Sequence, residues 1–371
     1  MTSVPRNQVE INLNALQENC RAIQKRVGSD TKILAVVKSD GYGHGMIPSA
    51  QALSEIGVNA FGVGEVHEAV SLREAGVRGD IVIFLGARET EYEEVVHFGL
   101  QPVIFDIRQL ETLASFAGSK EAQVGVHLKV DTGMGRLGVM PAELEKYAAV
   151  IRKEKGLFFA GLMSHFPCAD SAEFTSTREQ NELFGTLSAQ MTGSDQRFPL
   201  HIANSAAVIR SSDLHWDMVR PGLSLYGCYP SEECLDLVDL KPVMSFKTEI
   251  IQVKDVPAGF GISYGHTFVT SRPSRLALLP VGYNDGFLRS LSNRAHVLVH
   301  GKRAEQRGRV CMNVTVVDVT DIPGVQAGDE VVLMGRQGEE EITADEIAGW
   351  MGTINYEVLC LFGNLNQRVY L

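Results

Sequence analysis

The feature that most constrains the fold is a regular alternation of short apolar runs with amphipathic, helix-like segments over residues 33–227. The runs are short enough for strands and too apolar on both faces to lie against water, which is typical of parallel strands covered by helices. The intervening segments end at glycines such as Gly57, Gly76 and Gly99, as helices often do. The eight runs are ILAVV (33–37), AFGVG (60–64), DIVIFLG (80–86), PVIF (102–105), VGVHLKV (124–130), FAGLMSH (159–165), LHIAN (200–204) and MVRPGLSLYG (218–227).

Eight such units in about 220 residues predict an α/β fold with an N-terminal (β/α)₈ barrel, and an open doubly wound sheet is the second choice. We expect the barrel domain to span residues 1–240. Beyond it, Gly, Asp and Pro turns join strand-like runs, with one helix in ITADEIAGWM, so residues 241–371 are predicted to form a mostly β domain. The first strand, about residues 8–13, is a candidate member of that second domain, and Asn14 is the expected N-cap of the helix after it.

Charge and composition exclude several classes of protein. The chain has 34 Lys and Arg against 45 Asp and Glu, a net charge of -11, which argues against nucleic acid as a partner. No run approaches the roughly 18 apolar residues of a membrane span, and the N-terminus lacks a signal-peptide core, so we expect a cytoplasmic protein. The six cysteines form no CxxC pair and no HExxH occurs, so no metal is expected.

Polar residues gather where the predicted barrel strands end. Chemistry in such barrels takes place at the carboxyl ends of the strands. A strand-end lysine such as Lys38 is, taken alone, more often a solvated surface residue. Several other polar residues share this position, and their joint placement favours a functional site in which Lys38 is a nucleophilic amine. They are Lys129, Asp131, Arg136, His165, Asn204, Ser205 and Arg220.

The segment GMGRLG (133–138) matches the GxGxxG pattern of dinucleotide-binding loops. It follows the fifth predicted strand instead of the first, and Pro141 delays the next helix. No acidic residue stands at a strand end about 20 residues further on, where such a fold binds the ribose. We therefore reject a nicotinamide-dependent oxidoreductase.

Taken in order along the chain, nine motifs resemble those of bacterial alanine racemases: VKSDGYGHG, KVDTGMGRLG, SHF, HIANS, RPGLSLYG, SYG, GYNDG, GRVCM and INYE. Each motif is weak alone, but the ordered set spans residues 37–357 and is specific. The resemblance implies a pyridoxal 5'-phosphate-dependent enzyme that interconverts L-alanine and D-alanine and supplies D-alanine for peptidoglycan. It also implies a homodimer whose active sites each draw residues from both chains.

The resemblance assigns a role to each matching residue. Lys38 would hold the cofactor as an internal aldimine and exchange a proton on the D side, and Tyr264 of the partner subunit would act on the L side, a two-base mechanism. Arg136 and the partner subunit's Met312 would bind the substrate carboxylate. The residues that resemble the phosphate cradle of the family are Tyr42, Ser205, Gly222, Leu223 and Tyr356, and those that resemble its entrance are Tyr283, Arg289 and Arg309.

The remaining residues would affect the protonation of the cofactor, the position of Arg136 and the charge of the substrate-binding loop. Arg220 would face the pyridine nitrogen and disfavour its protonation, with His165 and Asn204 also at the cofactor. The resemblance implies a carbamate on Lys129 that holds Arg136. Asn313 stands where the family pattern has Asp, which leaves this loop one negative charge short and bears on substrate breadth.

Other functions are compatible with the same barrel. A broader amino-acid racemase, acting on serine or other amino acids, would share every motif. A pyridoxal-phosphate homeostasis protein would resemble only the first domain, so the second domain with Tyr264 argues against it. A decarboxylase is disfavoured, because Arg220 weakens the electron sink that decarboxylation needs.

Overall fold

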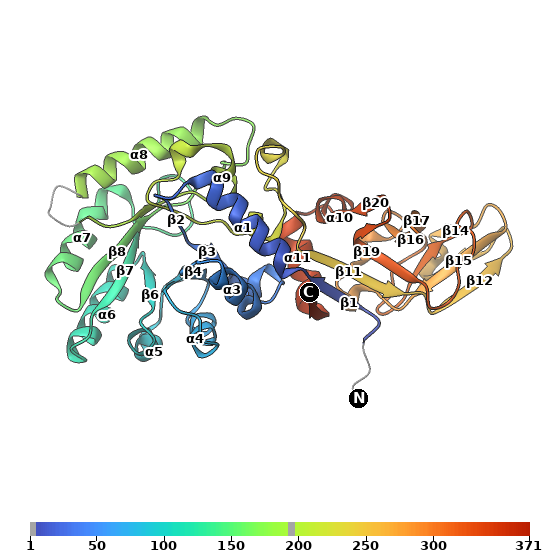
Figure 1. Ribbon diagram of the computed structural model, residues 1–371, viewed down its shortest axis with the longest axis horizontal. Helices are drawn as coiled ribbons and strands as arrows, with labels where there is room; N and C mark the ends of the chain where they lie inside the picture. Colours follow the sequence, from blue (N-terminus) through green and yellow to red (C-terminus); the bar gives the residue numbers. More distant parts are fainter. Residues whose placement is uncertain (1–4, 192–196) are drawn as a thin grey trace. The chain divides into compact units, whose positions relative to one another are not determined.

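A computed structural model describes residues 5–191 and 197–371, which divide into two compact units (Figure 1). One unit consists of Leu16–Gly41 and Met46–Lys241. The other consists of the described part of Met1–Ala15 together with Tyr42–Gly45 and Pro242–Leu371.

The first unit is the predicted barrel. A seven-stranded parallel sheet runs from β3 to β9 in chain order, and β10 pairs in parallel with β2. Only Leu34 separates β2 from β3, and its N–H donates to the carbonyl of Val219 (2.9 Å) while Arg220 N–H donates to Ala203 (2.9 Å). These bonds close the eight strands into a ring, which confirms the fold class. The strands are β2 (Lys32–Ile33), β3 (Ala35–Val36), β4 (Ala60–Val63), β5 (Asp80–Ile83), β6 (Gln101–Ile104), β7 (Val124–Lys129), β8 (Leu157–Met163), β9 (Leu200–His201) and β10 (Met218–Val219).

Helices lie outside the strands (Figure 1). They are α1 (Leu13–Val27), α3 (Met46–Glu55), α4 (Val66–Glu74), α5 (Tyr92–His97), α6 (Ile107–Ser119), α7 (Leu144–Lys153), α8 (Thr175–Met191) and α9 (Ser205–Arg210). The expected N-cap at Asn14 is wrong. Helix α1 already begins at Leu13, and the side chain of Asn12 accepts from the N–H of Ala15 (2.9 Å), so the cap lies two residues earlier.

Inside the barrel, one group of side chains is apolar. Alternate residues of a strand point to opposite faces, so each strand sends every second residue inward. A buried interior cluster contains Leu34, Ala60, Val82, Val103, Met163 and Met218. Burial of such side chains removes apolar surface from water, the main favourable contribution to folding.

The second unit is built on a ten-stranded sheet in the order β12-β15-β18-β17-β16-β19-β11-β1-β21, with β20 paired to β19. Strand β1 pairs antiparallel with β11 and parallel with β21, so it belongs to this sheet. The strands are β1 (Gln8–Ile11), β11 (Met244–Glu249), β12 (Gln252–Val256), β15 (Ser274–Leu279), β16 (His296–Val299), β17 (Lys302–Gln306), β18 (Thr315–Asp318), β19 (Glu330–Gln337), β20 (Glu340–Ile342) and β21 (Gln367–Tyr370), with a separate hairpin of β13 (Gly261–Ile262) and β14 (Phe268–Val269).

This unit contains one helix more than the sequence predicted. Helix α10 (Ala344–Met351) is the expected one, and the side chain of Thr343 caps it. Helix α11 (Asn355–Leu365) is the additional one, and it begins inside the motif INYE. Its Phe362 packs against Phe246 of β11 with ring centroids 4.9 Å apart. Among the described residues, no helix is both long enough and apolar enough to cross a bilayer.

Asn19 on α1 is a buried polar link within the barrel unit. Its side-chain amide donates to the carbonyls of Leu225 (3.0 Å) and Lys241 (2.8 Å), and its carbonyl accepts from Lys241 N–H (2.7 Å). Loss of one partner leaves buried polar groups unpaired, at a cost of about 1–3 kcal/mol. Asn19→Ala should therefore lower the free energy of unfolding by roughly 2–3 kcal/mol in urea denaturation. Asn14→Ala, exposed on the same helix, is the control, and an equal loss in both variants would contradict the role of Asn19.

Candidate active site

Lys38 follows β3 and begins a short left-handed turn. Ser39, Asp40 and Gly41 have φ values of 55°, 51° and 64°. Residues with a Cβ pay roughly 1–2 kcal/mol each for this conformation, so the turn needs support from its neighbours. Gly41 N–H donates to Val37 (2.8 Å), and the carboxylate of Asp40 accepts from Met46 N–H (2.7 Å) at the start of α3. The turn after Lys38 is thus held at both ends.

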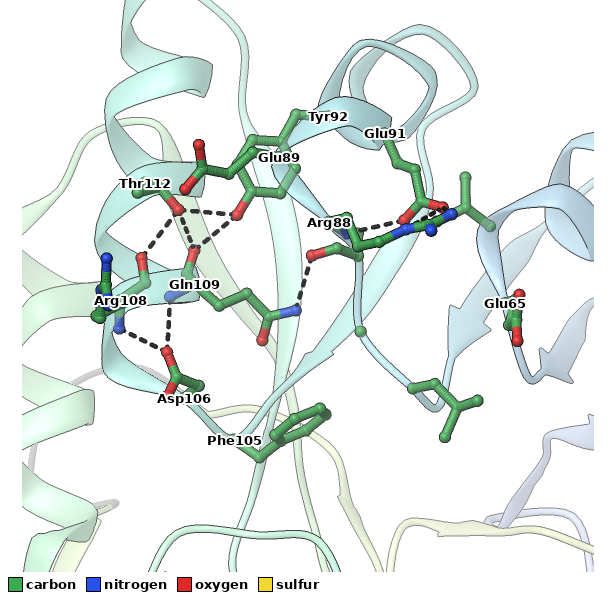
Figure 2. Close-up of a pocket in the computed structure, with 14 residues that line it drawn as sticks. Glu65, Arg88, Glu89, Glu91, Tyr92, Phe105, Asp106, Arg108, Gln109 and Thr112 are labelled. Atoms are coloured by element: carbon green, nitrogen blue, oxygen red, sulfur yellow. Dashed lines mark hydrogen bonds and ion pairs between the residues drawn. The ribbon is translucent and has the colours of Figure 1, made fainter.

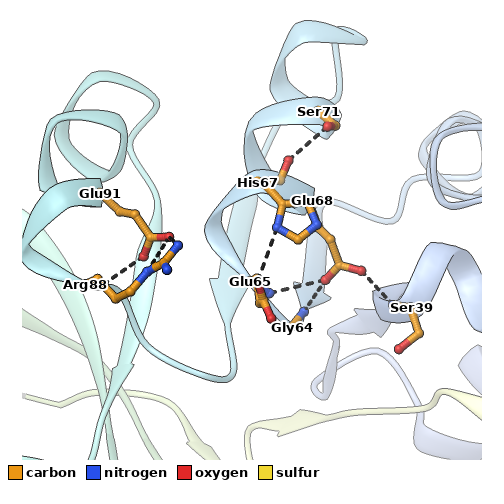
Figure 3. A network of polar contacts seen from close by, with 8 residues as sticks. All are labelled: Ser39, Gly64, Glu65, His67, Glu68, Ser71, Arg88 and Glu91. Carbon is orange, nitrogen blue, oxygen red and sulfur yellow. Dashed lines mark hydrogen bonds and ion pairs between the residues drawn. The ribbon is translucent and has the colours of Figure 1, made fainter.

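Glu68 adds a third support, and sequence reasoning missed it. Figure 3 shows its carboxylate between two loops: it accepts from Ser39 N–H (2.7 Å) on one oxygen and from Gly64 N–H (2.6 Å) and Glu65 N–H (3.2 Å) on the other. Glu68 occupies the third position of α4, where a capping-box glutamate stands. In the sequence, a capping box is indicated only by Glu68 standing three residues after Glu65. The first residue of a capping box is usually Ser or Thr, so a glutamate there is easily overlooked. Glu68 ties the backbone next to Lys38 to the loop after β4.

A group of cations gathers around the end of β7. Lys129, its last residue, is only 6% exposed. The pKa of its amine is lowered to about 8, mainly by burial. The positive charges of Arg220, Arg136 and Lys38 act in the same direction, and the carboxylate of Asp131 opposes them in part. Four like charges this close repel one another unless an anion lies among them. The cluster is therefore suited to anionic ligands.

The carboxylate of Asp131 offsets part of the positive charge around Lys129 and also organises the loop that follows. One oxygen accepts from the N–H groups of Gly133 (2.9 Å), Met134 (2.8 Å) and Gly135 (3.2 Å), and the other accepts from Arg136 N–H (3.1 Å). Burial acts to raise the pKa of Asp131, but these four hydrogen bonds outweigh it and lower the pKa. Asp131 thus shapes the loop GMGRLG and positions the backbone of Arg136.

Arg220 lies just after β10 and is 4% exposed. Its Nη2 donates to the carbonyls of Ser164 (2.6 Å) and Ile202 (3.1 Å) and lies 3.2 Å from Nδ1 of His165. Its Nη1 lies 3.1 Å from Nδ1 of His201. Because arginine only donates, both imidazoles accept at Nδ1. Burial and the charge of Arg220 lower the pKa of His165 well below its usual range, so His165 is neutral.

The residues after β9 and β10 form a set of donors suited to a phosphate. Ser205 begins α9, and its hydroxyl oxygen accepts from Gly222 N–H (2.9 Å) and Ser224 N–H (3.3 Å). Asn204 caps the same helix through Ala207 N–H (3.1 Å). The first N–H groups of α9 and of the short helix Leu223–Tyr226 have no partner within their own helices. Two adjacent helix starts supply backbone donors for an anion, so these residues fit the phosphate of the predicted cofactor.

Two residues of the predicted phosphate cradle belong to the other unit. The rings of Tyr42 and Tyr356 lie 5.9 Å apart between centroids. Burial is the main cause that raises the pKa of Tyr42, and the neighbouring Tyr356 and Cys360 raise it further, so its hydroxyl stays protonated and can donate. Tyr356 lies in the first turns of α11.

The remaining predicted residues meet in exposed loops of the β unit. Three loops are joined by hydrogen bonds from Ser263 Oγ to the Arg309 carbonyl (2.6 Å), from Tyr283 N–H to Cys311 (3.1 Å) and from Asn284 N–H to Met312 (3.1 Å). Tyr264 is 71% exposed and Met312 is 55% exposed, which is unusual for such apolar side chains. Arg289 and Asn313 are exposed as well. The structure thus brings the predicted residues together in two groups, one in each unit.

A pocket of about 690 Å³ lies beside the ends of β4, β5 and β6 and contains none of the predicted residues (Figure 2). Its polar groups bond one another: Arg88 pairs with Glu91, and Tyr92 Oη lies 2.9 Å from the hydroxyl of Thr112. Asp106 caps α6. These contacts give Arg88, Glu91, Tyr92, Thr112 and Asp106 structural roles.

Comparison with known proteins extends over the whole chain. The sequence model described as "Alanine racemase, N-terminal domain" matches residues 11–230, and "Alanine racemase, C-terminal domain" matches residues 243–370. The alanine racemase of Syntrophobacter fumaroxidans is 45% identical over 355 residues, covering 96% of this chain and 95% of that protein. The alanine racemase of Halothermothrix orenii is 43% identical over 361 residues, covering 97% and 94%.

Solved structures agree with the sequence comparison. The alanine racemase of a D-cycloserine-producing Streptomyces lavendulae superposes with a TM-score of 0.94 at 36% identity, covering 100% of this chain and 98% of that chain. That of Bartonella henselae, solved with covalently bound pyridoxal phosphate, gives 0.90 at 28% identity, covering 99% and 100%. Both domains and nearly every residue are thus accounted for by one family. The chain belongs to the alanine racemase family.

Proposed function

We propose that the protein is an alanine racemase that interconverts L-alanine and D-alanine with pyridoxal 5'-phosphate bound at the carboxyl ends of the barrel strands. The observation that carries this proposal is the gathering of Lys38, Lys129, Arg136 and Arg220 beside a set of backbone donors. A cofactor phosphate and a substrate carboxylate are the anions that such a site needs. The role proposed for the reaction is the supply of D-alanine for peptidoglycan in the cytoplasm.

The residues of the barrel unit have distinct tasks in this proposal. Lys38 holds the cofactor covalently, Ser205, Gly222 and Leu223 bind its phosphate, and Arg136 binds the substrate carboxylate. Bound pyridoxal phosphate serves as an electron sink that makes the Cα–H bond of the amino acid acidic. Arg220 remains protonated, since burial lowers its pKa only to about 9. Arg220 would therefore be unable to take a proton from the pyridine nitrogen of a bound cofactor.

Racemisation requires proton exchange on both faces of Cα. The Lys38 amine, once the substrate amine has displaced it from the cofactor, would serve one face, and we assign the other to the hydroxyl of Tyr264 of the partner subunit. The 71% exposure of Tyr264 supports this assignment, because a side chain that acts across an interface must be exposed in the single chain. Met312 N–H, Tyr283, Arg289, Arg309 and Asn313 of the same loops are proposed to reach the partner's site too.

The first prediction tests the activity itself. With pyridoxal phosphate added, the protein should bring L-alanine to a racemic mixture, followed by circular dichroism of alanine. Lys38→Ala should lower the rate by a factor on the order of 10³ or more, because it removes a base that reacts directly. Lys153→Ala, an exposed lysine on α7, is the control. If the wild-type protein leaves L-alanine unchanged, the proposed function is wrong.

The second prediction concerns the shared site. Lys38→Ala and Tyr264→Phe should each be nearly inactive alone. Mixing them with subunit exchange should restore up to about a quarter of the wild-type activity, because half of the dimers are mixed and each has one intact site of two. Mixing Lys38→Ala with Lys38→Met should restore none. Mixed dimers detected by mass spectrometry but without activity would place both residues on one chain.

The third prediction concerns Lys129. Its amine can add CO₂ with loss of one proton, and the carbamate so formed would pair with Arg136 and remove one of four like charges. Only the unprotonated amine reacts, so with limiting CO₂ the carbamate should decline as the pH falls below about 8, the pKa of Lys129. A ¹³C NMR carbamate signal after addition of ¹³C-bicarbonate should appear in the wild type and be absent in Lys129→Gln. The same signal in both proteins would refute the assignment.

A further inference from the structure

A chain of hydrogen bonds leaves the active site and runs through the barrel interior. It starts where Nη1 of Arg220 donates to Nδ1 of His201 (3.1 Å). Since His201 accepts at Nδ1, and burial with the charge of Arg220 lowers its pKa and keeps it neutral, its proton lies on Nε2. That nitrogen is 2.9 Å from Nδ1 of His127, which must therefore accept. Both imidazoles are buried, His201 fully and His127 to within 1%.

The same reasoning fixes every later bond. Burial lowers the pKa of His127 to about 3, so it is neutral and its proton lies on Nε2. It donates to Oε1 of Gln101 (3.0 Å), and the amide of Gln101 donates to Oδ1 of Asp80 (3.0 Å). The other oxygen of Asp80 pairs with Lys32 (2.5 Å). All donors point away from Arg220, and the chain ends at a carboxylate.

The chain crosses the barrel from one end to the other. Arg220 and His201 lie at the carboxyl ends of β10 and β9, whereas Gln101 and Asp80 are the first residues of β6 and β5. His127 lies in the middle of β7 and connects His201 at one end of the barrel with Gln101 at the other. The strands are parallel, so the first residues of β5 and β6 are at the end of the barrel opposite the active site.

Gly161 of β8 leaves the space that the two imidazoles need. A Cβ at this position would lie 2.5 Å from Nδ1 of His127 and 3.0 Å from Nε2 of His201, the two atoms that bond each other. Any side chain larger than hydrogen would thus displace the central link. The glycine at position 161 is thus required for the close approach of His127 and His201.

Stability alone does not explain this arrangement. Buried polar groups replaced by apolar side chains of the same volume often leave a protein equally stable. The contacts of Arg220 described above are two carbonyls and two neutral imidazoles, so its charge has no carboxylate beside it. A chain of bonds that all point the same way polarises its members and extends the influence of the terminal carboxylate toward the cation.

We propose that His201, His127, Gln101 and Asp80 are positioning residues for the reaction: they hold the guanidinium of Arg220 in one orientation and couple its charge to Asp80 at the opposite end of the barrel. His127, Gln101 and Asp80 do not lie at the active site. The effect on catalysis rests on the proposed racemase function, whereas the placement of protons on Nε2 of His201 and His127 does not.

The test uses ¹⁵N-histidine NMR on the cofactor-free protein, with signals assigned by single His→Gln variants. Both His127 and His201 should show protonated Nε2 and unprotonated Nδ1. Gln101→Met keeps the volume but removes the acceptor, so the nitrogen shifts of His201 should change although Gln101 does not contact it. Val82→Ala opens space beside Gln101, its partner on the neighbouring strand, but removes no hydrogen-bonding group. It should therefore leave the tautomers of both imidazoles unchanged.

Kinetics provide the second measurement. Gln101→Met should lower kcat about tenfold, within the range of typical couplings between distant sites, with little change in KM for alanine. Asp80→Asn keeps an acceptor for Gln101 but removes the charge, so it should preserve the tautomers of both imidazoles and still lower kcat. Unchanged His201 shifts in Gln101→Met, full activity in both variants, or an equal loss of kcat in Val82→Ala would overturn the proposal. An inactive wild type with the expected shifts would instead refute only the racemase function.

Discussion

The buried positive charge of Arg220 is the constraint on which the rest of the barrel interior depends. Removing a guanidinium from water is costly unless its donors are satisfied, and here two backbone carbonyls and two imidazoles accept from it. Because arginine cannot accept a hydrogen bond, these contacts also determine the tautomers of His165 and His201. One residue thus sets the protonation pattern on both sides of itself, toward the active site and toward the opposite end of the barrel.

An excess of positive over negative charge also explains the ligand preference of the site. Lys38, Lys129, Arg136 and Arg220 influence one another electrostatically, and the carboxylate of Asp131 is occupied by four backbone N–H groups. The unliganded protein therefore carries a repulsion that anionic ligands relieve. Binding of a phosphate and a carboxylate would contribute electrostatic stabilisation to the folded barrel as well as position the reacting groups.

Local backbone support is the other requirement of the site. The left-handed turn after Lys38 stores unfavourable conformational energy, and Glu68, Asp40 and the Gly41 N–H bond offset it. A strained turn that is held at several points presents Lys38 from a rigid backbone. In the β unit, hydrogen bonds between loops similarly fix the backbone around the exposed Tyr264 and Met312.

The sequence by itself determined the fold class and the strand-end positions of Lys38, Lys129, His165 and Arg220, because apolar periodicity and strand order are local properties of the chain. It did not reveal the N-cap at Asn12 or helix α11, where local signals compete. Nor did it reveal the roles of Glu68, Gln101, Asp80 and Gly161, residues that look ordinary in sequence. Their partners lie on other strands and loops, and only closure of the barrel brings those atoms within hydrogen-bond distance. The tertiary structure alone therefore decided which polar residues support the active site.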